Sequence, residues 1–201
     1  MSIRAFVAVN FSVPATRRLA EAAGEIRAQV KAAPELVTTW VPTANLHVTI
    51  KFLGDIAEEA APAIVLGLKR ALGEAGPGMA EPINPFEIKA TGFGAFPSLA
   101  EPRVLWFGVE GGAALQALHA RVEAGLEALG FAREARPFHP HVTIGRVARG
   151  AWPAGVTLGK PEIATSRITE VVLYESRPVQ KGQEYLALGR VGIGALARAA
   201  S

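Results

Sequence analysis

The arrangement of apolar and polar residues along the chain predicts several strands and three helices. Residues 2–9 alternate between the two kinds of residue, as a strand with one buried face does. Residues 46–53 and 136–147 carry the two clearest strand patterns, and β-branched residues are prominent in both. We expect further strands near residues 36–41, 85–91, 103–109, 166–175 and 184–190.

Apolar residues at helical spacing predict the three helices. The first begins near Ser12 and Pro14, which suit a helix cap and a first turn, and it continues to about residue 32. The second and third helices are expected over residues 56–75 and 112–129. The glycine- and proline-rich residues 91–102 predict an irregular loop between two strands. The apolar face of the third helix is expected to contain Leu115, Leu118, Val122, Leu126 and Leu129.

The tetrapeptide His-Val-Thr-Ile occurs twice, at residues 47–50 and 141–144, nearly half a chain length apart. Two copies indicate an internal duplication, whereas a repeat array would need more. The order of the elements, without strict alternation of strand and helix, predicts an α+β fold with mainly antiparallel pairing. We therefore expect one bilobal domain over residues 1–201, with two mainly antiparallel sheets flanked by helices. A central cleft would separate the lobes, and each lobe would contribute one H-x-T motif.

Each copy of the motif places a histidine and a threonine on the same face of a strand. Because side chains alternate, His47 lies with Thr49 and His141 lies with Thr143. Two imidazoles, each with an ordinary pKa of about 6.5, can act as base and acid in an in-line displacement at a phosphodiester. The threonine hydroxyls can hydrogen-bond the non-bridging phosphate oxygens. The competing interpretation is four ordinary strand residues, but a second copy in a chain with only four histidines favours catalysis.

Composition narrows the class of protein. With 201 residues, 50% of them hydrophobic and 19% charged, the chain has enough apolar surface for a packed interior. No apolar run reaches the roughly 18 residues of a membrane span, and the first residues lack an export signal. Cysteine is absent, which excludes disulfides, thiol nucleophiles and thiolate metal sites. We expect a cytoplasmic protein without a membrane partner, and its net charge of +3 suits a polyanionic ligand.

Other residues allow an alternative kind of site. His139 precedes His141 by two residues, and together with His47 it could form a three-histidine metal site. No carboxylate lies near these residues in the sequence, and a metal site would leave both threonines unused. His119 is expected on the solvated side of the third helix, and Trp40 is expected to cover an edge of the core. The prediction is therefore that no metal is bound.

Four stretches of the sequence resemble, in the same order, the blocks of a known family. They read TTWVPTANLHVTIKFLGDI, ATGFGAFPSLAEPRVLWFGV, RPFHPHVTIGRV and LYESRPVQKGQEYLAL. These stretches are similar to the bacterial and archaeal RNA 2′,3′-cyclic phosphodiesterases, also called 2′-5′ RNA ligases, of the 2H phosphoesterase superfamily. The resemblance covers about residues 2–190, and the contexts HVTIKFLG and PHVTIGR are its most specific parts.

The resemblance implies a bilobal enzyme without a cofactor that hydrolyses RNA 2′,3′-cyclic phosphate ends to 2′-phosphate ends. We also expect a monomer. Reversible 2′-5′ ligation would be a further reaction. The catalytic histidines of the family fall on His47 and His141, and its phosphate-binding threonines fall on Thr49 and Thr143. Two alternatives stay open: a phosphodiesterase for small cyclic nucleotides or 2′-5′ oligonucleotides, and an RNA-binding module without catalysis.

Two cationic residues near the motifs are further candidates for substrate binding. The resemblance assigns Arg146 to the phosphate, although strand parity places it on the face opposite His141. It reaches the phosphate only if the chain bulges or turns at Gly145. Parity places Lys51 on the catalytic face, two residues beyond Thr49, where it would hold a neighbouring phosphate or be solvated.

Overall fold

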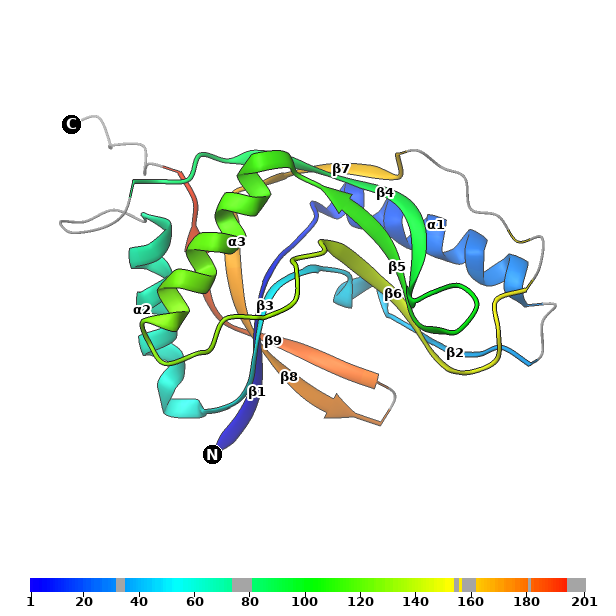
Figure 1. Cartoon of the computed structure of the whole chain (residues 1–201), viewed down its shortest axis with the longest axis horizontal. Helices are drawn as coiled ribbons and strands as arrows, with labels where there is room; N and C mark the ends of the chain where they lie inside the picture. Colours follow the sequence, from blue (N-terminus) through cyan, green and yellow to red (C-terminus); the bar gives the residue numbers. More distant parts are fainter. Residues whose placement is uncertain (32–34, 74–80, 154–155, 157–161, 181, 195–201) are drawn as a thin grey trace.

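The computed structural model describes residues 1–31, 35–73, 81–153, 156, 162–180 and 182–194 (Figure 1). Residues 195–201 of the expected domain thus lie outside the described part of the chain. The strands are β1 (Ser2–Val9), β2 (Val37–Trp40), β3 (Val48–Ala57), β4 (Phe86–Pro97), β5 (Pro102–Glu110), β6 (His141–Arg149), β7 (Ala164–Ile168), β8 (Glu170–Val179) and β9 (Gly182–Gly192). The helices are α1 (Val13–Val30), α2 (Ala61–Leu72) and α3 (Gly112–Glu127), with short 3-10 turns at Thr43–Asn45 and Glu58–Ala60.

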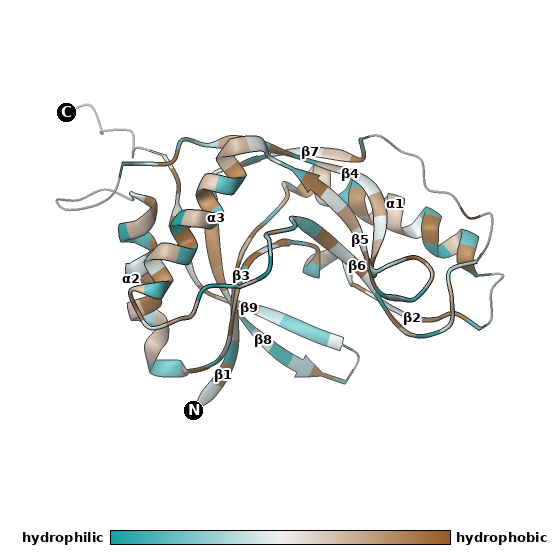
Figure 2. Ribbon diagram, in the orientation of Figure 1, coloured by the Kyte–Doolittle hydropathy of each residue, from teal (hydrophilic) through white to brown (hydrophobic). Residues whose placement is uncertain are grey.

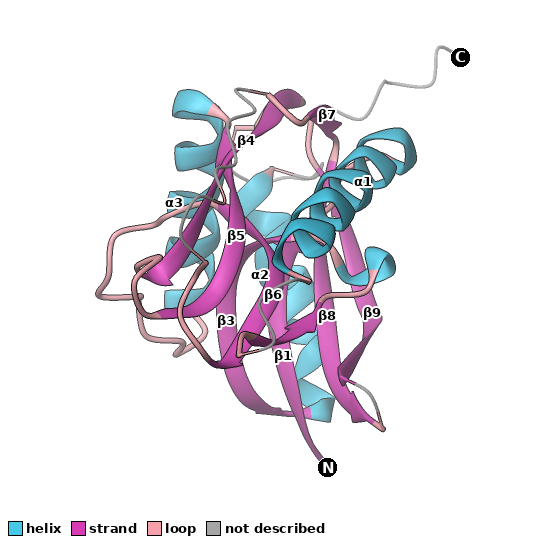
Figure 3. Cartoon of the chain, turned by 90° about the vertical axis from the view of Figure 1, so that its right-hand side faces the viewer, coloured by secondary structure: helices cyan, strands magenta, loops and turns pink. Residues whose placement is uncertain are grey.

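The strands form one antiparallel sheet. Its order is β7-β4-β5-β6-β3-β1-β8-β9, and β2 pairs with β6 beside this path. The sheet is strongly curved (Figure 3). Its two parts are joined between β3 and β6 by a single residue pair, Val48 with Val142. The predicted α+β class with antiparallel pairing is confirmed, but the two expected sheets are one, because this pair continues the ladder from one part into the other.

Each helix buries an apolar face. The buried residues of α1 follow the helical period and are Ala15, Leu19, Ala22, Ile26 and Val30. Helix α1 packs near β7, whereas α2 and α3 lie side by side, with α2 on β9 and α3 on β3 and β4 (Figure 1). Each helix carries both hydrophobic and hydrophilic residues along its length, as a helix with one buried face does (Figure 2). Of the described helices, none is both long and apolar enough to cross a membrane.

The contact between α2 and α3 depends on a glycine. A Cβ added to Gly125 would lie 2.5 Å from the Cβ of Ala71, so any larger residue would force the two helices apart. The predicted apolar face of α3 is buried as expected up to Leu126, but Leu129 lies beyond the end of the helix and is 44% exposed. Glu123, on the same helix, is also buried, and its carboxylate pairs with the amine of Lys51.

Several predicted boundaries differ from the structure. Strand β6 begins at His141 and not at residue 136, and helix α2 begins at Ala61 and not at residue 56, because β3 continues to Ala57. Much of the loop expected over 91–102 continues strand β4, where Phe93 pairs with Phe107 and Ala95 pairs with Leu105. Pairing with β5 thus overrides the local preference of glycine and proline for turns. The single strand expected over 166–175 is two strands, β7 and β8, which pair with different neighbours.

Candidate active site

The pair of Val48 and Val142 brings the two motifs together. Both valines are fully buried, so the neighbouring side chains of each strand point to the opposite face. The strands are antiparallel, so the residues that flank the pair follow in opposite order. His47 therefore lies on the side of Thr143, and Thr49 lies on the side of His141. We call these two histidines and two threonines the four-residue cluster.

The two imidazoles are held in the same way. Nδ1 of His47 lies 2.7 Å from the carbonyl oxygen of Asn45, and Nδ1 of His141 lies 2.7 Å from the carbonyl oxygen of His139. A carbonyl can only accept, so each Nδ1 carries the proton and donates it. In the neutral ring Nε2 is therefore unprotonated and can accept a hydrogen bond or a proton. The hydroxyl of Thr49 lies 3.0 Å from Nε2 of His47 and donates to it.

Aromatic rings enclose both imidazoles. The His47 ring lies 4.9 Å from the ring of Phe6 and 5.2 Å from that of Tyr185, measured between centroids. The His141 ring lies 5.1 Å from the ring of Phe96 and 6.3 Å from that of Trp106. Neither copy of the motif contains Phe6, Tyr185 or Trp106. These residues come from strands that are distant in sequence, so the motifs alone could not identify them.

This enclosure disfavours the charged form of each imidazole. Burial lowers the pKa of His47 to about 4, and the positive charges of His141 and Arg146 act in the same direction, whereas the bond to Asn45 opposes the shift. Burial also lowers the pKa of His141, and the charges of His139 and Arg146 add to the effect. Both shifts favour the neutral form of the two histidines in the free protein.

A bulge turns Arg146 toward the cluster. Trp106 pairs with Thr143 and Leu105 pairs with Gly145, so Ile144 is an extra residue in β6. Ile144 and Gly145 both face the core, and alternation resumes with Arg146 on the exposed face. The expected departure from strand parity at Gly145 is therefore present, and the bulge begins one residue earlier.

The same bulge occurs in the first motif and moves Lys51 away from the cluster. Ala8 pairs with Thr49 and Val7 pairs with Lys51, so Ile50 is the extra residue in β3. Lys51 then faces the core and is 5% exposed. The expected position of Lys51 on the catalytic face is thus corrected, because the bulge reverses the parity beyond Ile50. Phe52, 63% exposed, takes the position in β3 that corresponds to Arg146 in β6.

The amine of Lys51 instead belongs to a buried ion pair. Its Nζ donates to the two carboxylate oxygens of Glu123 at 2.9 and 2.8 Å, and to the carbonyl oxygen of Ala132 at 2.7 Å. The backbone N–H of Glu134 also donates to Glu123, at 3.3 Å. All three hydrogens of the ammonium group have acceptors, so none is left for a phosphate. The pair connects β3 and α3 to the segment that leads into β6.

His47, His139 and His141 do not form the alternative metal site. Within the described residues, no group of three or more histidine, aspartate or glutamate side chains is placed to hold a metal ion. The ring of His139 lies against Phe96, with centroids 5.3 Å apart. His119, which was expected in solvent, stacks on Phe138 with centroids 4.0 Å apart, and its side chain is only 18% exposed.

A pocket of about 200 Å³ borders the imidazole of His47. It lies against β8, β9 and the turn before β3, and its lining combines aromatic, amide and cationic side chains. These residues are Asn10, Ala44, Asn45, His47, Tyr174, Tyr185, Ala187 and Arg190. A molecule in this pocket would contact His47 directly.

Comparison with known proteins identifies the family of the chain. The family model of the 2′-5′ RNA ligase superfamily matches residues 15–177. An RNA 2′,3′-cyclic phosphodiesterase of Aeropyrum pernix is 35% identical over 153 residues, which cover 70% of this chain and 81% of that protein. A protein of the same name from Methanothermobacter thermautotrophicus is 30% identical over 190 residues, 92% of this chain and 96% of its own.

Solved structures show the same fold. The TT0787 protein of Thermus thermophilus superposes with a TM-score of 0.75 at 27% identity, over 96% of this chain and 99% of that one. LigT of Escherichia coli in complex with 3′-AMP superposes with a TM-score of 0.69 at 26% identity, over 96% and 98% of the two chains. By sequence and by fold, the chain belongs to the 2′-5′ RNA ligase superfamily.

Proposed function

We propose that the protein is an RNA 2′,3′-cyclic phosphodiesterase that uses His47 and His141 as its acid and base. The observation that carries the proposal is the matched pair of imidazoles on either side of Val48 and Val142, each with Nδ1 bound to a backbone carbonyl. Curated relatives named RNA 2′,3′-cyclic phosphodiesterase support the substrate class.

In the proposed reaction the neutral imidazole of one histidine takes a proton from water through Nε2. The water oxygen forms a bond to phosphorus while the bond from phosphorus to the 3′ oxygen breaks. The other histidine, protonated on Nε2, gives its proton to that leaving oxygen. The product carries a 2′-phosphate and a free 3′ hydroxyl. The carbonyls that bind Nδ1 keep both rings oriented through the exchange.

The other members of the site would hold the phosphate. The hydroxyls of Thr49 and Thr143 share the face of the imidazoles and can donate to the non-bridging oxygens, Thr49 in exchange for the bond that it makes to His47 in the free protein. Arg146 adds a planar, permanently charged fork that suits two phosphate oxygens. None of these roles requires a metal ion, and we propose that the reaction proceeds without one. The pocket beside His47 offers space for part of the nucleotide.

The test is an assay on an RNA oligonucleotide that ends in a 2′,3′-cyclic phosphate, in the presence of excess EDTA. We expect a product with a 2′-phosphate end and a rate unchanged by the chelator. Loss of activity that zinc restores would contradict the metal-independent mechanism. Binding without turnover would support the RNA-binding module, and a strong preference for a cyclic mononucleotide would support the small-substrate alternative. The reversible 2′-5′ ligation is a separate reaction. It is tested with one RNA that has a 2′,3′-cyclic phosphate end and a second RNA that has a 5′-hydroxyl end.

The pH dependence of the rate should be bell-shaped. The rate falls on the acid side as the base is protonated, and on the alkaline side as the acid loses its proton. Because kcat/KM reports the free enzyme, where burial lowers the pKa of both histidines, its optimum should lie on the acid side of 6.5. A bound phosphate favours both charged imidazoles, so the optimum of kcat should lie at higher pH. A rate that rises with pH without an alkaline fall would exclude a histidine acid.

Arg146 can be tested by charge and by shape separately. We expect Arg146→Ala to lower kcat/KM by about tenfold to a hundredfold, as for loss of a charge-assisted hydrogen bond of roughly 1.5–3 kcal/mol. Arg146→Lys keeps the charge but loses the planar fork, so its loss should be intermediate. Steady-state kinetics measure both variants, with Arg149→Ala, further along β6, as the matched control. An Arg146→Ala variant with unchanged kcat/KM would remove this residue from the site.

A further inference from the structure

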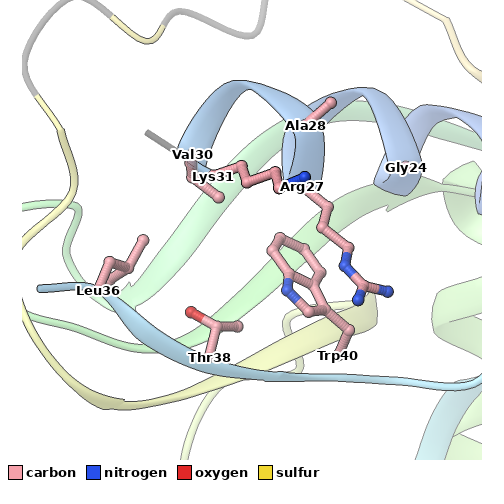
Figure 4. A pocket seen from close by; sticks show the side chains of 8 residues that line it. All are labelled: Gly24, Arg27, Ala28, Val30, Lys31, Leu36, Thr38 and Trp40. Carbon is pink, nitrogen blue, oxygen red and sulfur yellow. The ribbon is translucent and has the colours of Figure 1, made fainter. Parts of the chain in front are cut away.

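A larger pocket, of about 470 Å³, lies between the last turns of α1 and strand β2. Figure 4 shows Arg27 and Lys31 reaching over it from the helix, and Leu36, Thr38 and Trp40 facing it from the strand side. Its volume falls within the range of about 300–1,000 Å³ found for small-molecule sites.

This pocket lies on the face of the sheet opposite the four-residue cluster. A Cβ added to Gly145 would lie 3.0 Å from Cγ2 of Thr38 and 3.5 Å from Cε3 of Trp40, so both residues are on the core side of β6. Arg146 and His141 project from the other side. A ligand of this pocket is therefore separate from a substrate at the histidines.

The lining provides three kinds of contact. Arg27 and Lys31 are cations at the end of α1, and neither forms an ion pair with a carboxylate of the described residues. The indole of Trp40 lies beside the Arg27 guanidinium in Figure 4 and offers an aromatic surface. The hydroxyl of Thr38 is buried and has no hydrogen-bond partner. A buried hydroxyl without a partner is unfavourable, and a ligand atom that displaces the side chains covering it would remove that cost.

We propose that this pocket is a second binding site, for a nucleoside monophosphate. The phosphate binds between Arg27 and Lys31, whose two charges outweigh the partial negative charge at the end of the helix. The base stacks on Trp40, and the hydroxyl of Thr38 hydrogen-bonds a polar atom of the base or ribose. The combination of two cations, an aromatic surface and an unpartnered hydroxyl favours a nucleotide over a simple anion or an apolar molecule.

The three tryptophans of the chain permit a direct test. Trp40 lines this pocket, Trp106 lies beside His141, and Trp152 lies against Phe93. With 5′-AMP as the probe, we expect the indole N–H signal of Trp40 to shift in nitrogen-15 NMR spectra and to saturate with its own Kd. Trp106 reports any binding at the histidines in the same titration, and a Trp40→Phe variant assigns the signal. A Trp40 signal that does not move at saturating AMP overturns the proposal.

Paired variants separate the cations from general charge effects. Arg27→Gln with Lys31→Gln should weaken the binding seen at Trp40 by about tenfold or more, leaving the Trp106 response and the phosphodiesterase rate unchanged. The control Arg17→Gln with Arg18→Gln removes the same charge from an exposed part of α1 and should change neither. Equal weakening by the two pairs would overturn the site.

Two further measurements test the nucleotide itself. Thr38→Val removes the unpartnered hydroxyl, so the empty protein should not lose stability, but AMP should bind several-fold more weakly at Trp40. AMP should also bind more tightly than inorganic phosphate or adenosine alone, because it makes both kinds of contact. If phosphate alone binds as tightly as AMP, the base makes no contact and the assignment to a nucleotide is wrong.

Discussion

Replacing His47 or His141 with alanine is expected to lower turnover of a 2′,3′-cyclic phosphate RNA by about 10²–10⁴-fold in each case. Neither imidazole has a substitute, because among the described hydrogen bonds only His47 and His141 have an imidazole nitrogen bonded to a backbone carbonyl. The double variant should be little worse than either single variant, as for groups that act as a unit. Single-turnover rates measure the chemical step.

His119→Gln is the matched control for these variants. It removes a histidine that stacks on Phe138 and lies away from the cluster, so the rate should change little. Circular dichroism and urea unfolding show whether each variant folds. A folded His47→Ala or His141→Ala protein with near-normal turnover would contradict the proposed mechanism.

Glu123→Leu is expected to lower the free energy of unfolding by about 3–5 kcal/mol. The change leaves the ammonium group of Lys51 buried without its carboxylate, and an uncompensated buried charge is costly. The double variant Lys51→Met with Glu123→Leu removes both charges and should recover most of the loss. Urea titrations of the three proteins measure the effect.

The control for this pair is Glu127→Leu on the same helix. Glu127 is bonded to Arg133 at 2.7 Å, but both side chains are more than half exposed. Such a pair contributes about 0–1 kcal/mol, so its loss should be small. If Glu123→Leu were no more costly than Glu127→Leu, the buried pair would not hold the segment before β6 in place.

The four motif residues could be located from the sequence because the argument needs only strand parity and a repeated tetrapeptide. Beyond the bulges, strand parity no longer predicts which face a side chain occupies. Gly145 indicated a possible departure in the second motif, and the bulge that Arg146 would need is present beside it. The first motif has Lys51 at the equivalent position, and nothing local distinguishes a bulge at Ile50 from a regular strand.

Long-range partners account for most of the other differences. Lys51 was expected at a phosphate or in solvent because its partner, Glu123, lies 72 residues away on another element. His119 was expected in solvent for the same reason, since Phe138 covers it from the segment before β6. The glycine- and proline-rich half of β4 was expected as a loop because its pairing with β5 depends on the register of both strands, which local preferences do not encode.

The single pair of Val48 and Val142 divides the sheet into parts that are interleaved along the chain. β1, β3, β8 and β9 lie on one side of the pair, whereas β2 and β4 to β7 lie on the other. His47 therefore depends on the first strand for Phe6 and on the last for Tyr185. During synthesis, we expect a nascent chain to remain catalytically silent until β9 has left the ribosome and paired, however early its histidines were made.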